Sequence, residues 1–244
     1  MNNENIKIGI VGHKGRMGQE ILKILSSKNN IDIVTENGEI GENKMDLFRK
    51  SNIVIDFTNE NGLKECLECA KLTKKPLVSG STPINNDIME QIQDSSKYTK
   101  ICWSANMSIG IAVVSKISAV CAKILKNYDC EILEKHHNKK KDAPSGTAIM
   151  IGKTIAKERN LDFDKIISLD RNAIRKNNQI GFASIRGGNI VGEHEIMFIG
   201  DNDEIIISHK AYNRTLFAIG AVECAMKLLQ QKTNGFYKIE DLLF

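Results

Sequence analysis

Short apolar runs alternate with segments of helical periodicity through the first half of the chain. Five runs have the length and composition of β-strands: residues 6–11, 31–34, 52–57, 76–79 and 100–103. Between them, apolar residues recur at the spacing of an α-helix over residues 17–25, 63–72 and 84–92. Strands that alternate with helices are typical of βαβ units, so we expect a parallel, doubly wound sheet of the Rossmann type.

The pattern changes after Met107. Helical periodicity over residues 109–126 and 148–157 flanks a strand-like run at 129–135. Three β-rich runs follow at residues 181–186, 191–199 and 204–209, separated by Gly-Gly and Gly-Asp-Asn-Asp turns, before a last helix at 216–229. We therefore expect the second half to form an α+β domain that is rich in antiparallel sheet.

Composition and charge narrow the class of protein. The 244 residues are 41% apolar and 26% charged, which is ordinary for a globular chain of one or two domains. The formal net charge of +4 gives no indication of a nucleic-acid partner. No apolar run approaches the roughly 18 residues that a membrane span needs, and the start of the chain lacks a secretory pattern. A cytoplasmic protein without a membrane partner is expected.

The six cysteines give no sign of a metal site or a disulfide framework. Only Cys66 and Cys69 are close in sequence, and they lie within a predicted amphipathic helix. No second Cys-x-x-Cys pair and no His-x-x-x-His is present to complete a zinc site. We expect reduced thiols that pack against a core.

A glycine-rich loop follows the first strand directly and precedes the first helix. Residues 12–18 read Gly-His-Lys-Gly-Arg-Met-Gly, a pattern that permits a tight turn and lets a pyrophosphate approach the N–H groups at a helix start. Glu36 follows the second strand, where a carboxylate can bind a ribose hydroxyl, whereas Lys14 and Arg16 suit a 2′-phosphate. The loop predicts a nicotinamide dinucleotide, NADH or NADPH; a purely structural glycine turn is the alternative.

Small and polar residues follow three further strands. Asp56-Phe-Thr58, Gly80-Ser-Thr82 and Ser104-Ala-Asn-Met107 each stand where an apolar strand ends. In doubly wound sheets, ligands bind beyond the carboxyl ends of the strands. Each segment alone could be an ordinary loop, but their recurrence at equivalent positions favours a shared binding crevice.

The densest cluster of chemically active side chains begins at Glu134 and continues through a cationic loop at residues 136–142. His136 and His137 lie there among four lysines, at positions 135, 139, 140 and 141. Directly afterwards, Pro144 stiffens a turn and Ser145-Gly-Thr147 begins a helix, whose N–H groups and hydroxyls suit an anion. The lysines add positive charge, so a carboxylate or a phosphate is the expected ligand. A solvated basic loop with Ser145 as a plain N-cap is the alternative.

Histidine in this loop suits proton transfer, because its ordinary pKa is close to neutral. Neighbouring lysines are expected to lower the pKa of the histidines and so to ease donation of a proton. The loop contains no His-Glu-x-x-His arrangement, and no carboxylate cluster accompanies the two histidines, so no metal is expected.

Motifs spread over nearly the whole chain carry a family resemblance. They are the glycine loop, Asp56-Phe-Thr58, Glu134-x-His-His-x-x-Lys-x-Asp-Ala-Pro-Ser-Gly-Thr-Ala148, Arg186-Gly-Gly-x-x-Val-Gly-x-His194 and Phe217-Ala-x-Gly-Ala221. This combination resembles the dihydrodipicolinate reductase (4-hydroxy-tetrahydrodipicolinate reductase) family. The block from His136 to Thr147 is its most specific part.

The resemblance implies an oxidoreductase of lysine and diaminopimelate biosynthesis. Such an enzyme reduces 4-hydroxy-tetrahydrodipicolinate, a cyclic dicarboxylic imine, to tetrahydrodipicolinate with NADH or NADPH. The resemblance also implies a Rossmann-type domain over residues 1–107, onto which residues 214–244 pack back. Residues 108–213 would form an α+β domain for substrate binding and oligomerisation, in a homotetramer.

Individual roles follow from the same resemblance. His136 corresponds to the proton donor and Lys140 to the catalytic lysine. Residues that correspond to ligands of the substrate carboxylates are His137, Ser145, Gly146 and Thr147. Residues that correspond to contacts of the nicotinamide dinucleotide are Gly12, His13, Lys14, Gly15, Arg16, Met17, Glu36, Gly80, Ser81, Thr82, Ser104, Ala105, Asn106 and Met107.

Two segments depart from the family pattern, and two other functions are open. The usual Gly-Thr-Thr-Gly is Gly80-Ser-Thr-Pro83, and Asn-Phe-Ser is Asn106-Met-Ser108, so we expect an altered cofactor pocket. Another two-domain oxidoreductase, such as an amino-acid dehydrogenase, would lack the block at residues 136–147. A nicotinamide-sensing regulator without chemistry would need a DNA- or partner-binding module, for which no segment remains unassigned.

Overall fold

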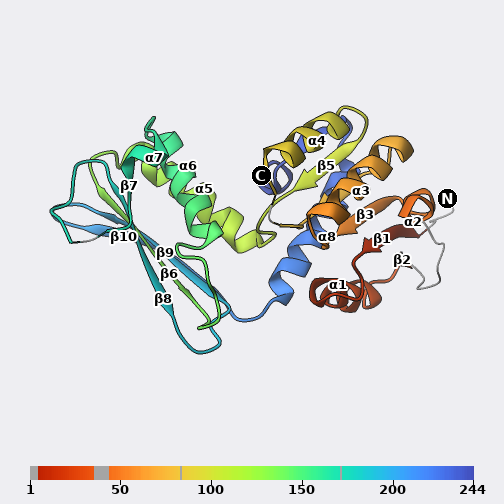
Figure 1. Ribbon diagram of the computed structural model, residues 1–244, viewed down its shortest axis with the longest axis horizontal. Helices are drawn as coiled ribbons and strands as arrows, with labels where there is room; N and C mark the ends of the chain where they lie inside the picture. The colour runs from red at the N-terminus through yellow and green to blue at the C-terminus, as the bar shows by residue number, and fades with distance from the viewer. Residues whose placement is uncertain (1–4, 36–43, 83, 171) are drawn as a thin grey trace. The chain divides into compact units, whose positions relative to one another are not determined.

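The chain divides into two compact units (Figure 1). The computed structural model describes residues 5–35, 44–82, 84–170 and 172–244. The first unit consists of Met1–Ile109 and Arg214–Phe244, and the second consists of Gly110–Asn213. The chain therefore leaves the first unit, forms the second and returns to complete the first.

The first unit contains a six-stranded parallel sheet. In their spatial order, its strands are β11 (Gly235–Tyr237), β5 (Lys100–Trp103), β4 (Leu77–Ser79), β3 (Ile53–Asp56), β1 (Ile6–Val11) and β2 (Ile31–Thr35). The central strands are buried runs of Ile, Val and Leu, as expected where helices cover both faces. The strand order reverses between β1 and β3. Doubly wound sheets bind their ligands at such a switch point.

Helices cover both faces of this sheet (Figure 1). They are α1 (Arg16–Ser26), α2 (Lys44–Lys50), α3 (Glu60–Thr73), α4 (Asn86–Ser96), α8 (Thr215–Gln230) and the short α9 (Ile239–Leu243). Helices α2, α3 and α4 share a hydrophobic core with one face, which includes Ile101 of β5. The next residue, Cys102, contacts Cys224 of α8, so α8 packs on the opposite face. The predicted Rossmann-type, doubly wound sheet is confirmed.

Helix α8 is joined to the rest of the first unit by the Lys100 side chain and by a close backbone approach at Gly220. The Lys100 Nζ atom donates to the carbonyls of Leu229 and Gln231, both at 3.1 Å, and so satisfies the C-terminal end of the helix. Gly220 lies directly against the carbonyl of Met107, where an added Cβ would overlap the oxygen. Helix α8 is therefore part of the core of the first unit.

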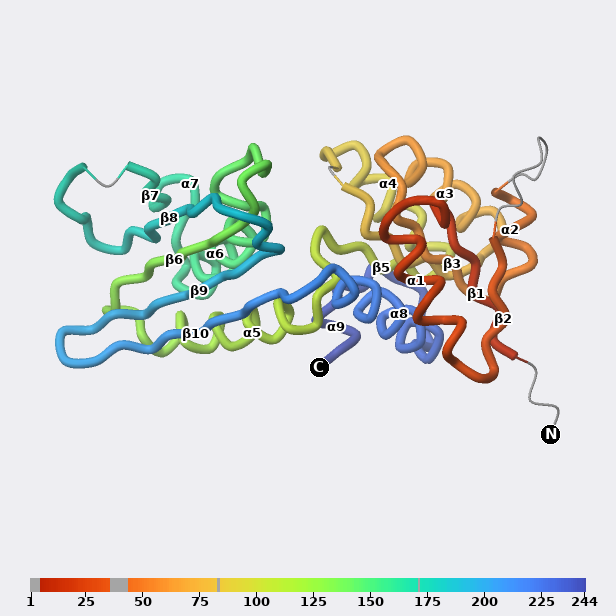
Figure 2. Tube along the Cα trace, turned by 90° about the horizontal axis from the view of Figure 1, so that it is seen from below, coloured from red at the N-terminus to blue at the C-terminus, as the bar shows by residue number. Residues whose placement is uncertain are grey.

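The second unit contains a five-stranded mixed sheet. Its spatial order is β10 (Glu204–Ala211), β9 (Gly192–Ile199), β6 (Asp129–His136), β8 (Ile180–Arg186) and β7 (Ile167–Ser168). Helices α5 (Ile109–Ile124) and α6 (Gly146–Glu158) share a core with one face of this sheet, and the short α7 (Phe163–Ile166) follows α6 (Figure 2). The predicted α+β class is confirmed.

The strand pairing of the second unit is less antiparallel than its sequence suggests. Strand β9 is antiparallel to both of its neighbours, but β6 pairs with β8 in parallel, as β8 does with β7. Strand β6 lies between β8 and β9, so the Gly-Gly turn joins two strands that do not pair. Periodicity predicts that a segment is a strand but not which strand lies beside it.

The elements that the sequence analysis missed are all short. They are α2, α7, α9, β7 and β11, none longer than seven residues, which is too few for a clear period. The thiols of Cys66 and Cys69 are buried in α3, and all six cysteines are free, as predicted.

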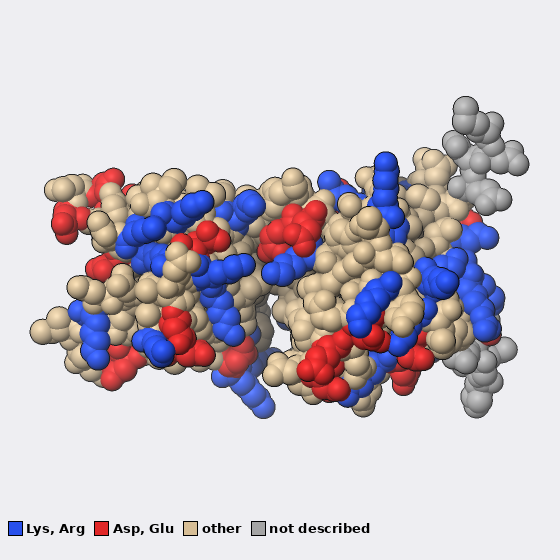
Figure 3. Space-filling view, turned by 90° about the horizontal axis from the view of Figure 1, so that it is seen from above, with Lys and Arg blue, Asp and Glu red and all other residues tan. Residues whose placement is uncertain are grey.

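Surface charge is mixed. On the face shown in Figure 3, Lys and Arg side chains are interspersed with Asp and Glu. No helix among the described residues combines the length and the apolar character that crossing a membrane requires.

Candidate functional site

The loop between β1 and α1 turns tightly at the switch point of the first sheet. Gly12 has a φ of 80°, which glycine adopts without strain, and its carbonyl accepts a hydrogen bond from the Gly15 N–H at 3.0 Å. A Cβ on Gly18 would overlap the backbone of Gly12 and His13. The glycines therefore let the loop pack directly on the first turn of α1, as a dinucleotide-binding loop requires.

Helix α1 has no side-chain cap at its N-terminus. Its N-cap is Gly15, and no acidic residue lies in its first turn. Helices α3 and α4 are capped by the side chains of Asn59 and Asn85. The first turn of α1 therefore presents N–H groups that suit a phosphate, and the exposed Lys14 and Arg16 lie at the same helix start.

A buried carboxylate joins the ends of β3 and β4. Asp56 is fully buried and accepts hydrogen bonds from the hydroxyls of Thr58, Ser79 and Ser81 at 2.6, 2.7 and 2.7 Å. Burial raises the pKa of Asp56, and the hydrogen bonds oppose that increase. These hydrogen bonds thus connect the Asp56–Thr58 segment with the Gly80–Thr82 segment at the carboxyl edge of the sheet.

The loop after β5 joins the same edge. The indole N–H of Trp103 donates to the carbonyl of Ser81 at 3.0 Å, and the Ser104 N–H donates to the carbonyl of Ser79 at 3.2 Å. An added Cβ on Gly12 would lie only 3.0 Å from the carbonyl oxygen of Phe57, which follows β3. The ends of β1, β3, β4 and β5 therefore lie side by side, as the sequence analysis expected.

The remaining cofactor candidates differ in accessibility. Thr82 and Ala105 are exposed, and Asn106 is half-buried, with its side chain accepting from the Ser108 N–H at 2.8 Å. The Met107 side chain is buried in the core of the first unit. Glu36 and Pro83 lie outside the described residues.

In the second unit, His136 is the last residue of β6, the middle strand of the sheet. Its Nδ1 lies 2.5 Å from Oε2 of Glu134, which is two residues earlier on the same face of the strand. The Glu134 side chain is fully buried, whereas that of His136 is 12% exposed. A partly accessible imidazole on a buried carboxylate is an arrangement that can donate a proton.

Two further residues surround this pair and were not predicted as site residues. Arg186 on β8 is the register partner of His136 and donates to both carboxylate oxygens of Glu134, at 2.8 and 2.6 Å. His194 on β9 is the register partner of Glu134, and its ring packs edge-on against that of His136. Arg186 and His194 both belong to a motif of the sequence, but their proximity to His136 depends on strand register.

The pKa of His136 is lowered, as the sequence analysis expected, but for a different main reason. Burial is the largest cause, hydrogen bonding and charge from Glu134 oppose it, and Lys140 and Arg186 lower the pKa further. Sequence analysis considered only a carboxylate cluster at the histidines and did not consider a single carboxylate, Glu134, as a partner of His136. That carboxylate is adjacent in space although one residue separates it from His136 in sequence.

Ser145 performs the N-cap role that the sequence analysis kept as an alternative. Its hydroxyl accepts from the Ala148 N–H at 3.3 Å and lies 3.1 Å from Nε2 of His194. The side chain is buried, so the exposed part of the α6 start is formed by Gly146 and the half-buried Thr147.

The cationic loop is closed by a backbone hydrogen bond and an ion pair, both made by Lys140. The Lys140 N–H donates to the carbonyl of His137 at 3.1 Å, and the Lys140 Nζ atom pairs with Asp142 at 2.9 Å. Lys139 and Lys141 are exposed, and His137 is half-buried. Positive charge therefore gathers between the end of β6 and the start of α6.

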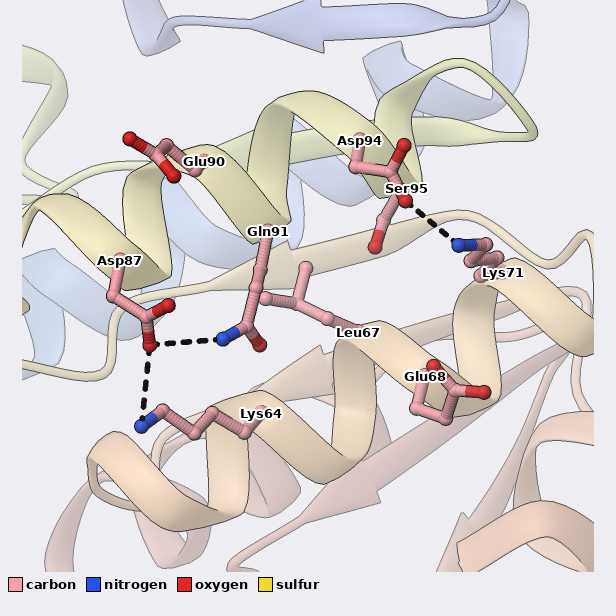
Figure 4. Close-up of a pocket in the computed structure, with 9 residues that line it drawn as sticks. All are labelled: Lys64, Leu67, Glu68, Lys71, Asp87, Glu90, Gln91, Asp94 and Ser95. Carbon is pink, nitrogen blue, oxygen red and sulfur yellow. Dashed lines mark hydrogen bonds and ion pairs between the residues drawn. The ribbon is translucent and has the colours of Figure 1, made fainter.

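A separate groove between α3 and α4 is lined by charged side chains (Figure 4). Lys71 pairs with Asp94 at 2.7 Å, and Asp87 pairs with Lys64 at 3.5 Å and accepts from the Gln91 amide at 3.0 Å. The two lysines are thus paired with two of the four carboxylates that line the groove, and the other two are Glu68 and Glu90.

Comparisons with known proteins cover nearly the whole chain. Residues 6–107 match the family model described as dihydrodipicolinate reductase, N-terminus, and residues 110–243 match that of the C-terminus. A protein of Wolbachia pipientis subsp. Culex pipiens named 4-hydroxy-tetrahydrodipicolinate reductase is 39% identical over 98% of this chain and 99% of its own. A Campylobacter jejuni protein of the same name is 40% identical over the same shares.

Solved structures share the fold. A dipicolinate-bound dihydrodipicolinate reductase from Paenisporosarcina sp. TG-14 superposes with a TM-score of 0.80 at 20% identity, over 98% of this chain and 100% of that one. The DAP dehydrogenase of C. glutamicum gives a TM-score of 0.58 at 10% identity, over 98% and 94%. An α/β fold of this kind is thus common to several dehydrogenases.

The two family models and the relatives agree with the resemblance that the motifs carry. They also decide between the functions left open, because models of a reductase family match both units. The chain belongs to the dihydrodipicolinate reductase family.

Proposed function

We propose that the protein reduces 4-hydroxy-tetrahydrodipicolinate to tetrahydrodipicolinate with NADH or NADPH, in lysine and diaminopimelate biosynthesis. The observation that carries the proposal is the His136–Glu134 pair beside an anion-binding helix start, in a chain of this family. In the reaction, the substrate gains a hydride and a proton and loses its hydroxyl group as water. The enzyme must therefore hold a dicarboxylate and supply one proton.

A pyridine nucleotide supplies the hydride when it is bound. The fit of this chain to its pyrophosphate is supported by the uncapped N-terminus of α1 and by the close turn at Gly12. Lys14 and Arg16 suit the extra phosphate of NADPH, so both cofactors are included in the proposal. The proposed contacts are Gly12, His13, Lys14, Gly15, Arg16, Met17, Glu36, Gly80, Ser81, Thr82, Ser104, Ala105, Asn106 and Met107.

His136 is the proposed proton donor. Its Nδ1 is engaged by Glu134, so Nε2 is the atom from which a proton passes to the carbon left electron-rich by hydride addition. The step leaves a neutral imidazole, and burial favours that form by lowering the pKa of His136. Solvent returns the proton before the next turnover.

The substrate carboxylates are proposed to bind at the cationic loop and the start of α6. Lys140 provides a positive charge close to His136, and His137 and the first turn of α6 provide hydrogen-bond donors. Gly146 and Thr147 are the accessible residues of that turn, and Ser145 supports them as the N-cap. This is a positioning and electrostatic role.

We also propose a cytoplasmic homotetramer that needs no nucleic acid or membrane. The six free cysteines suit a reducing compartment. The sheet face opposite α5 and α6 carries the exposed Ile185, Ile199 and Ile206, which supports assembly through the second units. Mass photometry at the assay concentration tests this assembly, and a monomer that is fully active would overturn it.

A coupled assay tests the reaction. A dihydrodipicolinate synthase makes the unstable substrate in place, and oxidation of NADH and of NADPH is followed separately in the near ultraviolet. We expect oxidation that depends on both the synthase and this protein. If the purified, folded protein oxidises neither cofactor, the proposed function is wrong.

A further inference from the structure

Glu134 is a buried carboxylate at the centre of the second unit's polar cluster, although sequence analysis gave it no role. Its side chain is fully buried. Oε2 contacts Nδ1 of His136 at 2.5 Å and accepts from Arg186 at 2.8 Å. Oε1 accepts from Arg186 at 2.6 Å and from the Ser145 N–H at 3.2 Å. Both oxygens are therefore occupied by donors from three different segments.

These contacts keep Glu134 charged. Burial by itself would raise the pKa of this carboxyl, but hydrogen bonds from Arg186, Ser184 and His136 outweigh burial and place the pKa at about 2. The two-pronged pairing with Arg186 is the geometry that compensates a carboxylate in the interior. An ionised carboxylate only accepts hydrogen bonds, so Nδ1 of His136 must carry a hydrogen.

The His136 ring is also fixed from its other sides. The ring of His194 meets it edge-on, with centroids 5.3 Å apart. Beside Nε2 lies Gly192, where an added Cβ would come within 3.1 Å of that nitrogen. Glu134 thus holds the imidazole at Nδ1 and His194 packs against the ring, while Gly192 has no side chain beside Nε2.

We propose that Glu134 is a positioning residue that holds His136 in the Nδ1–H tautomer and favours its protonated form, and that Arg186 moderates this effect. The inference rests on the proposed function of His136 as proton donor. The charged and titratable groups that face His136 are Glu134 from β6, Arg186 from β8, His194 from β9 and Lys140 from the following loop. Only Glu134 among them attracts a proton to the ring, so Glu134 and Arg186 must act in opposite directions.

Two single variants separate these opposite effects. Glu134→Gln keeps the shape of the side chain and removes its charge, so His136 should lose its proton at lower pH and turnover at about pH 8 should fall on the order of tenfold or more. Arg186→Met removes the moderating charge, so His136 should keep its proton to higher pH. NMR titration of His136 in the substrate-free protein and the pH profile of kcat both measure the change.

A matched control and a double variant complete the experiment. Glu193→Gln removes a carboxylate that lies on the other sheet face and pairs with Lys135 and Lys210, and it should leave both profiles unchanged. Each single variant leaves a buried charge without its partner and can therefore fail to fold. The double variant Glu134→Gln/Arg186→Met removes both charges and provides the test in that case. The double variant should still titrate below wild type, because Glu134 bonds directly to the ring.

Different experimental results would overturn the positioning role of Glu134 and the proposed reductase function. An unshifted His136 titration in Glu134→Gln or in the double variant would overturn the positioning role, even if kcat fell, because a merely structural contact lowers kcat without moving the titration. A wild-type protein without reductase activity would overturn the proposed function instead. The NMR titration needs no substrate, so it decides the inference in either case.

Discussion

The imidazole of His194 lies edge-on to that of His136, with the two ring planes inclined by 78°. His194 is also within 3.1 Å of the Ser145 hydroxyl through its Nε2 atom. It thus connects the proposed proton donor on β6 with the N-cap of α6. Burial, and then the charge of a protonated His136, lower the pKa of His194 to about 4.

Because of His194, we expect the protein to lose stability as the pH falls from about 6.5 to about 4. A histidine in the unfolded chain takes up a proton near pH 6.5, whereas folded His194 stays neutral until about pH 4. The unfolded state then binds more protons, so the free energy of unfolding decreases by up to about 3 kcal/mol from this group. Urea unfolding at about pH 7.5 and 4.5 measures the loss. His194→Gln should show a smaller loss, and an equal one would contradict the prediction.

Replacing the proposed proton donor should abolish most turnover without unfolding the protein. His136→Ala is expected to lower kcat on the order of 10²- to 10⁴-fold, the usual contribution of a general acid. His137→Ala, one residue away, should act mainly on KM because His137 is proposed to bind a carboxylate. Steady-state kinetics in the coupled assay measures both. Near-wild-type turnover of His136→Ala would remove this residue from the mechanism.

The two hydroxyl residues at the start of α6 should behave differently. Ser145→Ala loses the cap and the His194 contact, so it should lower the free energy of unfolding by about 1 kcal/mol. Thr147→Val lies in the accessible first turn and should raise KM with little change in melting temperature. Kinetics and thermal unfolding of both variants provide the test. If Thr147→Val lowered only kcat, the anion-binding role of this turn would be wrong.

The close approach of α8 to the segment after β5 predicts a large effect from one added methyl group. Gly220→Ala places a Cβ against the Met107 carbonyl and should destabilise the protein by about 1–3 kcal/mol. The neighbouring Ile219 is 49% exposed, and Ile219→Ala should change stability by about 0.5 kcal/mol or less. Chemical denaturation compares the two. Equal, small effects would mean that the helix shifts without cost.

Sequence alone predicted the long elements and the local part of the site. The glycine loop, the polar strand ends and the block around His136 were found because each is contiguous in sequence and its chemistry can be recognised from spacing. The parallel first sheet followed from the strand–helix alternation. Short elements such as α2 and β11 have too few residues to show a period.

The parts that sequence missed depend on contacts between distant segments. Arg186 is 50 positions from His136 and becomes its neighbour only because β6 pairs with β8 in parallel. His194 joins through the antiparallel pairing of β6 with β9. The burial of Ser145 could not be predicted from sequence either, because a buried N-cap serine and an exposed one occur in the same sequence context. Glu134 could have been suspected, because residues two apart on a strand share a face.

The division of the chain affects how the protein is made. Strand β11 and helix α8 belong to the first unit, yet the ribosome synthesises them after the whole of the second unit. Until the second unit has been synthesised, the edge of β5 lacks its partner β11, and the sheet face beside α1 lacks α8. An unpaired strand edge is a site of misassociation, so the nascent chain carries this risk until β11 has been synthesised. A chaperone that binds exposed β-sheet edges would act on the first half of this chain longer than on the second.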